Sequence, residues 1–204
     1  MKPAGVLNRA RVGLATGMVL VLCFFRHGVV KRVLGAAYAH VEILVASGAR
    51  STAYAASPGG VFSCLDPTDL GLTDEHYTFL ALPTTLSEDD MVMRTCDACS
   101  QSYIPYNRWD TALTTLLPAR WTSEVDLFHA PTLHAAQAVV LILRECLDQG
   151  SPILRALQGV NSRSVKAAQL AVHLRGVGYV VNHESVGNLM GGARLPVDFA
   201  CQFV

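Results

Sequence analysis

Two short stretches of this sequence carry residue types that could do chemistry. His40 opens the apolar run A-H-V-E-I-L-V-A, and Glu42 follows two residues later; His134 and Gln137 open the run L-H-A-A-Q-A-V-V-L-I-L. The first run favours a strand, and the second favours a buried helix with small residues at its start. A helix N-terminus lowers the pKa of a thiol, and a histidine across a cleft can activate it. A lone histidine at a strand end can equally be structural, so residue types alone leave both interpretations open.

The bulk composition predicts one well-packed domain. The chain has 204 residues, of which 51% are hydrophobic and only 16% are charged, so a large core is expected over about residues 18–176. Sixteen basic residues balance sixteen acidic ones, and no basic stripe indicates a nucleic-acid partner. The six cysteines are not spaced like a secreted disulfide scaffold. They predict reduced thiols in an intracellular protein. The compact, Ala-rich chain without a clean export signal favours a viral or intracellular source, in the cytoplasm, in a host cell or in a virion.

The N-terminal region allows two interpretations. Residues 1–11 are basic and residues 12–25 are apolar, which resembles a signal peptide. No A-x-A-like cleavage site follows, and the apolar run is shorter than the ~20 residues that a membrane span needs. We therefore predict a buried strand over Met18–Phe25, and no transmembrane segment.

The rest of the chain alternates strand and helix patterns. The patterns predict an α+β domain in which an antiparallel β-sheet or small barrel packs against helices. Strands are expected at 39–46, 51–57, 61–65, 76–82 and 179–182. Helices are expected at 28–37, from Ser87, at 135–147, and from Asn161 or Ser162 to Leu174. Three glycines after Glu184 predict an irregular tail over 184–204.

The order of these segments resembles a known superfamily. A-H-V-E-I-L-V-A-S-G is similar to the histidine strand of the circularly permuted branch of NlpC-type papain-like cysteine hydrolases. The segments A-Y-A-A-S-P-G-G-V-F-S-C-L-D, I-P-Y-N-R-W-D and H-A-A-Q-A-V-V-L-I-L resemble its hairpin, its Pro-Tyr-Asn element and its nucleophile helix. The resemblance runs from about Val19 to Gly176 and implies a permuted papain-like fold. Bacterial proteins and proteins of large DNA viruses both resemble this pattern.

The resemblance implies a set of site residues. His40 matches the catalytic histidine, and Ala135 occupies the nucleophile position, where the superfamily has cysteine. Gln137 matches the polar residue two positions later. We expect His40 and residue 135 to face each other across a cleft. Glu42 shares a strand face with His40, so it could orient the ring or make a structural or substrate contact. His134, Gln137 and Tyr106 are expected to contact substrate. His134 and Tyr106 could border the cleft, and His134 could instead only help cap the helix.

An alanine at the nucleophile position has three explanations. The first is that alanine is an engineered inactivating substitution. The second is that it is natural and marks a pseudoenzyme. The third is that the alignment is displaced and another cysteine is the nucleophile. Two functions follow. One is a thiol hydrolase or acyltransferase acting on a peptide, isopeptide or lipid ester, inactive as written. The other is a binding or structural protein on the same scaffold, for which a viral protein is one interpretation. The sequence does not indicate the oligomeric state.

Cys96 and Cys99 form the motif C-D-A-C within a predicted helix. A zinc site would need two further ligands, which Cys64 and a histidine such as His76 or His129 could supply. Nothing in the spacing requires them, so buried structural thiols are the better interpretation. A glycine-rich phosphate loop is absent from the sequence, and neither a metal nor a cofactor is expected.

Overall fold

The fold is an α+β arrangement built on one open antiparallel sheet. The computed structural model describes residues 18–26, 37–38, 40–47, 50–56, 62–66, 72–102 and 134–190. Six strands pair in the order β4-β3-β2-β1-β5-β6, and every neighbouring pair is antiparallel. The strands are β1 (Met18–Phe25), β2 (His40–Ser47), β3 (Arg50–Ala56), β4 (Phe62–Leu65), β5 (Tyr77–Leu82) and β6 (Tyr179–Val181). The predicted α+β class with an antiparallel sheet is confirmed, and the sheet is open.

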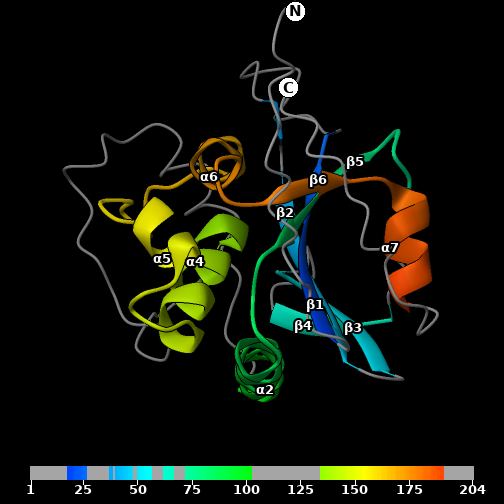
Figure 1. Ribbon diagram of the computed structural model, residues 1–204, viewed down its shortest axis with the longest axis horizontal. Helices are drawn as coiled ribbons and strands as arrows, with labels where there is room; N and C mark the ends of the chain where they lie inside the picture. Colours follow the sequence, from blue (N-terminus) through cyan, green and yellow to red (C-terminus); the bar gives the residue numbers. More distant parts are fainter. Residues whose placement is uncertain are drawn as a thin grey trace, which may run out of the picture.

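Helices cover the two faces of the sheet unequally. On one face lie α2 (Leu86–Gln101), α4 (Ala135–Cys146), α5 (Pro152–Ala156) and α6 (Ala167–Leu174), as Figure 1 shows. On the other face lies α7 (His183–Met190). We call these the α4 face and the α7 face of the sheet. The described helices include none that is both long enough and apolar enough to span a membrane.

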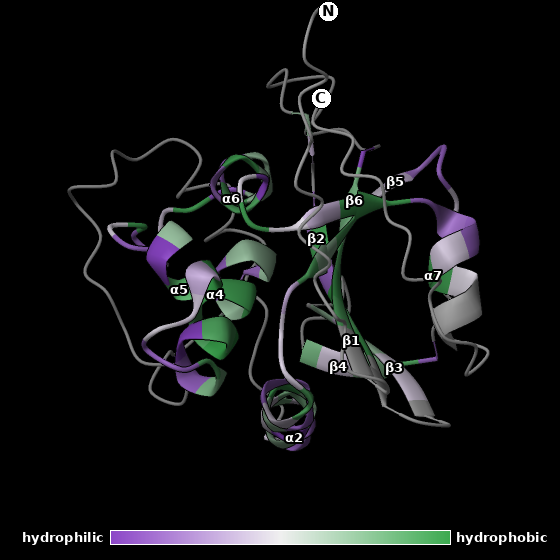
Figure 2. Cartoon of the chain, viewed as in Figure 1, coloured by the Kyte–Doolittle hydropathy of each residue, from purple (hydrophilic) through white to green (hydrophobic). Residues whose placement is uncertain are grey.

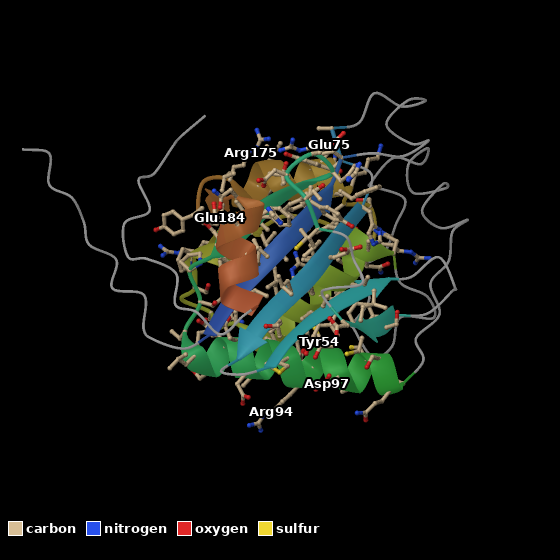
Figure 3. The ribbon with its side chains drawn as sticks, turned by 90° about the vertical axis from the view of Figure 1, so that its right-hand side faces the viewer. Tyr54, Glu75, Arg94, Asp97, Arg175 and Glu184 are labelled. Atoms are coloured by element: carbon tan, nitrogen blue, oxygen red, sulfur yellow. The ribbon has the colours of Figure 1, made fainter. Side chains whose placement is uncertain are left out.

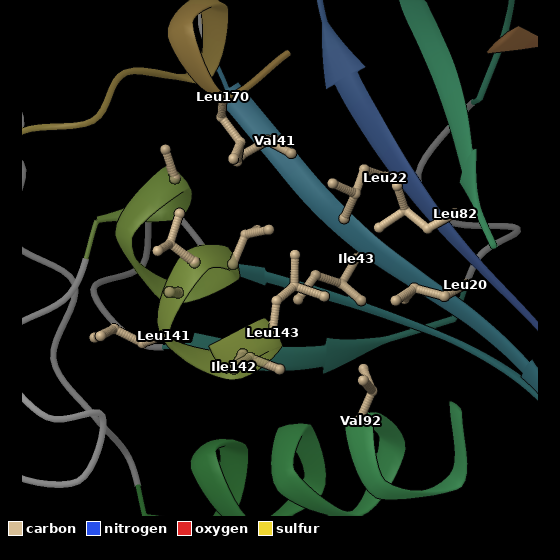
Figure 4. Close-up of a cluster of buried hydrophobic side chains, with 14 of the residues drawn as sticks. Leu20, Leu22, Val41, Ile43, Leu82, Val92, Leu141, Ile142, Leu143 and Leu170 are labelled. Atoms are coloured by element: carbon tan, nitrogen blue, oxygen red, sulfur yellow. The ribbon is translucent and has the colours of Figure 1, made fainter. Parts of the chain in front are cut away.

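The main core lies between the sheet and α4. Leu20, Leu22 and Phe24 of β1 point to the α4 face, and so do Val41, Ile43 and Val45 of β2. They meet Ile142 and Leu143 of α4, Val92 of α2 and Leu170 of α6 (Figure 4). Figure 2 shows that β1 and much of α4 are apolar. Because α4 is buried on most of its surface, its apolar run has the character predicted for a central helix.

A smaller core lies on the α7 face. Val21 and Cys23 of β1, Leu44 of β2 and Phe79 of β5 belong to it, together with Val186 of α7. The side chains of β1 therefore alternate between two buried surfaces. A strand buried on both faces reads as a continuous apolar run, which is the pattern of M-V-L-V-L-C-F-F. The strand predicted at Met18–Phe25 is confirmed residue for residue.

A capping box and a side-chain bond fix α2. The Thr85 hydroxyl accepts the Glu88 N–H at 3.3 Å, and Glu88 Oε2 accepts the Thr85 N–H at 2.7 Å. The helix thus begins at Leu86, one residue before the predicted start. Near its other end, the Tyr54 hydroxyl donates to Asp97 Oδ1 at 2.7 Å, which ties β3 to α2 (Figure 3).

Two predicted segments differ from the structure. Asn161 does not cap α6: its Oδ1 accepts the N–H groups of Arg163 and Ser164 in a turn, and the helix begins at Ala167. The irregular tail predicted after Glu184 is wrong for residues up to Met190, because they form α7. Asn182 Oδ1 accepts the Ser185 N–H there, and Val186 is buried against the sheet. The helix predicted at 28–37 lies almost entirely outside the described residues.

Gly178 offers a test of the packing between the end of α6 and β5. A Cβ at this position would lie 2.7 Å from Leu80 Cγ, which cannot move without disturbing the core. We predict that Gly178→Ala lowers the free energy of unfolding by about 1–3 kcal/mol, as overpacking does. Gly176→Ala is the matched control, because a Cβ there meets no atom within 4 Å. Urea denaturation measures both, and equal stabilities of the two variants would contradict the packing described.

Candidate functional site

The start of α4 is built by a reciprocal cap. His134 Nδ1 accepts the Gln137 N–H at 3.3 Å, and Gln137 Oε1 accepts the His134 N–H at 3.4 Å. Because Nδ1 accepts, the imidazole proton is on Nε2, which donates to the Arg163 carbonyl at 3.1 Å. His134 and Gln137, two of the three residues expected to contact substrate, therefore use these polar atoms to cap the start of the helix. Their side chains are buried, at 5% and 3% residue exposure.

Ala135 is the first residue of α4 and belongs to the main core. It is 8% exposed and lies directly after the cap residue His134. A thiol at this position would meet the N-terminal end of the helix dipole, which favours a thiolate. The position thus has one of the two features that a thiol nucleophile requires. The other feature is a base within reach.

His40 and Glu42 lie on the α7 face of the sheet. In the β1–β2 register His40 pairs with Phe25, and Glu42 pairs with Cys23. Paired residues share a face, and both Phe25 and Cys23 pack in the smaller core under α7. Between them along β2, Val41 points to the α4 face, where Ala135 lies. The expected juxtaposition of His40 and residue 135 is therefore not present in the structure.

The reason lies in the composition of β2. Val41, Ile43, Leu44 and Val45 are all apolar, so the strand carries apolar residues on both faces. Alternation therefore could not show which face meets α4. The sequence correctly indicated that His40 and Glu42 share a face, and the structure brings them together. Tyr106 lies outside the described residues, so its expected place at the cleft has no structural description.

His40 and Glu42 form a close and buried pair. His40 Nε2 lies 3.9 Å from Glu42 Oε1, and their side chains are 22% and 9% exposed. Burial lowers the pKa of His40 to about 4 and raises the pKa of Glu42 to about 7. Glu42 Oε2 has no hydrogen-bond partner among the described residues. At neutral pH the imidazole is uncharged, as a general base must be, although the described residues place no activated nucleophile beside it.

Cys23 is the thiol nearest to this pair in the strand register. It is fully buried, and burial followed by the negative charge of Glu42 raises the pKa of its thiol. A carboxylate beside a thiol disfavours the thiolate, which is the nucleophilic form. Cys23, Glu42 and His40 therefore lack the electrostatics of a thiol catalytic set. Tyr77 borders the same surface, and its ring lies 5.1 Å from Phe25 and 5.9 Å from Phe79.

The cysteines of α2 are buried structural thiols. Burial raises the pKa of both Cys96 and Cys99, and neighbouring cysteines raise it further. Cys146 is also buried and donates to Thr95 Oγ1 at 3.2 Å. Within the part of the chain that the structure describes, no group of three or more His, Cys, Asp or Glu residues could hold a metal ion.

A further polar cluster was not anticipated from the sequence. Tyr38, Arg26, Thr78 and Arg175 meet at the end of the sheet where β2 and β5 begin. They come from four separate segments, so no local motif joins them. The comparisons with known proteins add no site assignment, since no family model, curated protein or solved structure matches this chain.

The opposite pKa changes of His40 and Glu42 predict opposing pH dependences of stability. Glu42 has a folded pKa above its ordinary 4.5, so its contribution to stability is highest below pH 4.5 and falls as pH rises through about 7. His40 has a folded pKa below its ordinary 6.5, so its contribution is highest above pH 6.5 and falls as pH drops through about 4. In the wild-type protein the two contributions largely cancel.

Single substitutions should expose each contribution. Above pH 7, Glu42→Gln should be more stable than the wild type by about 3 kcal/mol, and its stability should fall on acidification from pH 6.5 to 4. His40→Asn should show the reverse slope, losing stability as pH rises from 4.5 to 7. Chemical denaturation across pH 4–8 measures this, with the exposed Glu145→Gln as control. Parallel pH profiles for the two variants would rule out the neutral buried pair.

Proposed function

We propose that this protein is a non-catalytic binding or structural protein, on an α+β scaffold that resembles the permuted papain-like fold. The observation that carries the proposal is the separation of His40 from residue 135 by the sheet. Thiol hydrolysis needs a nucleophile and a base within about 3–4 Å of each other, allowing for a loose site without substrate. Here the nucleophile position holds alanine, and the candidate base lies on the α7 face.

The use of neighbouring polar groups supports the same proposal. The His134 and Gln137 side chains maintain the α4 cap, so these atoms are not available to orient a substrate. Glu42 lies 3.9 Å from the His40 ring, but their burial favours the neutral form of each. A triad carboxylate acts by being ionised beside its histidine. The pair is better suited to filling the sheet interior than to proton transfer.

One observation favours the second candidate, a thiol hydrolase with its nucleophile replaced. Ala135 is the first residue of a 12-residue helix, where a cysteine would have a lowered pKa. On this proposal the substrates implied by the resemblance are a peptide, an isopeptide or a lipid ester. The hydrolase requires His40 to assist a residue 135 nucleophile, and the binding protein does not. That difference can be measured.

The test introduces cysteine at position 135 and asks whether His40 assists it. Cys64 is exposed, so the comparison uses a Cys64→Ser background to remove its labelling. We predict that Ala135→Cys reacts with a thiol-directed probe at a rate that His40→Ala leaves unchanged. The hydrolase candidate predicts that His40→Ala slows this reaction about 10²–10⁴-fold. Site-resolved mass spectrometry after timed labelling at pH 6 to 7 gives the rates.

A reference thiol and an activity assay complete the comparison. Ala98→Cys introduces an exposed cysteine within α2, and it reports the rate of an unassisted helical thiol. Ester or peptide turnover by Ala135→Cys, together with its loss in Ala135→Cys with His40→Ala, would overturn the binding-protein proposal. Failure of Ala135→Cys to turn over either class supports it.

We also propose that the protein resides in a reducing intracellular environment. The five cysteines in the described residues are all unpaired, namely Cys23, Cys64, Cys96, Cys99 and Cys146. We predict that protein isolated from its natural source without reductant has six reactive thiols after denaturation, equal to its cysteine content. A deficit of two thiols that reductant restores would contradict this location.

A further inference from the structure

Four polar side chains converge at one end of the sheet. Arg26 directly follows β1, and its Nε donates to Thr78 Oγ1 of β5 at 2.7 Å. Thr78 and Arg175 both hydrogen-bond the Tyr38 phenol, and the Arg175 Nη2 donor lies 3.3 Å from the phenol oxygen. Because Thr78 accepts from Arg26, its own proton is free to be donated to Tyr38. The phenol oxygen of Tyr38 is therefore bonded directly by Arg175 and, through Thr78, is linked to Arg26.

Each member of this cluster is held by a separate anchor. The Tyr38 ring packs on Phe24, with the ring centroids 5.3 Å apart. Arg26 also donates through Nη1 to the Asp74 carbonyl at 3.2 Å. Arg175 is the C-cap residue of α6, and Figure 3 shows it at the end of the molecule far from α2. The arrangement is thus fixed by packing and backbone contacts, as a preorganised binding site must be.

Neither Arg26 nor Arg175 forms an ion pair with another described residue. The Asp74 carboxylate lies nearby and accepts the His183 N–H at 2.7 Å, so it offsets part of the positive charge of the cluster. Burial acts to raise the pKa of Tyr38, but the bonds from Thr78 and Arg175 and the charges of both arginines outweigh it and lower the pKa. The local field therefore favours negative charge at this point.

We propose that Tyr38, Arg26 and Arg175 form a binding site for a phosphate monoester group. Two guanidinium groups match the charge of a phosphate dianion, and arginine donors fit phosphate oxygens in pairs. A carboxylate brings a single charge and would leave the site positive. A role at the α6 C-terminus would account for Arg175 alone, and a bond to Thr78 would account for Arg26 alone. Neither accounts for the hydrogen bonds that Thr78 and Arg175 both make to the Tyr38 phenol. The site does not rest on position 135 or on His40, so it stands independently of the proposed function.

Binding of inorganic phosphate tests the site directly. At low ionic strength we expect saturable binding by calorimetry, and no binding of acetate, which brings a single charge. Arg175→Gln should weaken phosphate binding about tenfold, the loss expected for one charged hydrogen-bond donor. Tyr38→Phe keeps the ring on Phe24 and should also weaken binding. The matched control is Arg155→Gln, which removes an exposed charge from α5 outside the cluster.

A second readout separates a specific site from general attraction of anions. Bound phosphate adds negative charge beside Tyr38, so phosphate should raise the pH at which this phenol ionises. Ultraviolet difference absorption follows that ionisation, with Tyr38→Phe as the blank. Equal weakening by Arg155→Gln and Arg175→Gln, or a Tyr38 titration that phosphate leaves unchanged, would overturn the proposal.

Vesicles distinguish the two sources of a phosphate monoester. Binding to phosphatidic acid vesicles but not to neutral ones, lost in Arg175→Gln, would support the site and assign it to a lipid headgroup. Binding of free phosphate without vesicle binding would support the site and assign it to a soluble ligand. Binding to neither would overturn it.

Discussion

The pairing of β1 with β2 is the constraint on which the other arrangements depend. β1 is hydrogen-bonded on both sides and buried on both faces, with Leu20–Phe24 at most 1% exposed. Its register sets Phe25 opposite His40, and this assigns each β2 side chain to a face. A slip by one residue would turn Val41 and Ile43 towards α7 and bring His40 and Glu42 under α4. The face on which His40 and Glu42 lie therefore depends on one residue of strand register.

The packing of α4 explains why the observed register is favoured. The slipped register would bury the Glu42 carboxyl among the apolar side chains of the main core, which costs several kcal/mol without a partner. It would also remove Ile43 and Val45 from contact with Leu143 and its neighbours. In the observed register, by contrast, Glu42 lies beside His40 near the margin of the smaller core. Hydrophobic burial thus decides the orientation of the only polar residues in this half of β2.

The sequence predicted the positions of the strands and helices better than it predicted which faces of them pack together. Strand and helix periods are local, so β1, β4 and most of α4 were located to within a residue or two. Which face of a strand packs against α4 cannot be decided from local sequence when a strand such as β2 is apolar on both faces. Helix α7 was missed because the glycines around it suggested a tail, although Val186 is fully buried and packs the helix against the sheet.

The candidate sites show the same division. The closeness of His40 and Glu42 follows from their spacing on one strand, whereas the distance to Ala135 depends on tertiary packing. The cluster of Tyr38, Arg26 and Arg175 joins residues 137 positions apart in the chain, and neither arginine stands in a motif. The one sign of the cluster in the sequence is that each arginine directly follows a strand or helix. Because arginines are common at such positions, this sign could not identify the cluster.

The burial of His40 and Glu42 beside each other constrains the net charge inside the sheet. Between about pH 4 and 7 the pair holds one dissociable acidic proton, whichever of the two side chains carries it. With the proton on Glu42 both groups are neutral; with the proton on His40 they form an ion pair. The sum of charges is zero in both cases. The neutral pair and the ion pair therefore differ only by a dipole, and neither places net charge in the interior beneath α7.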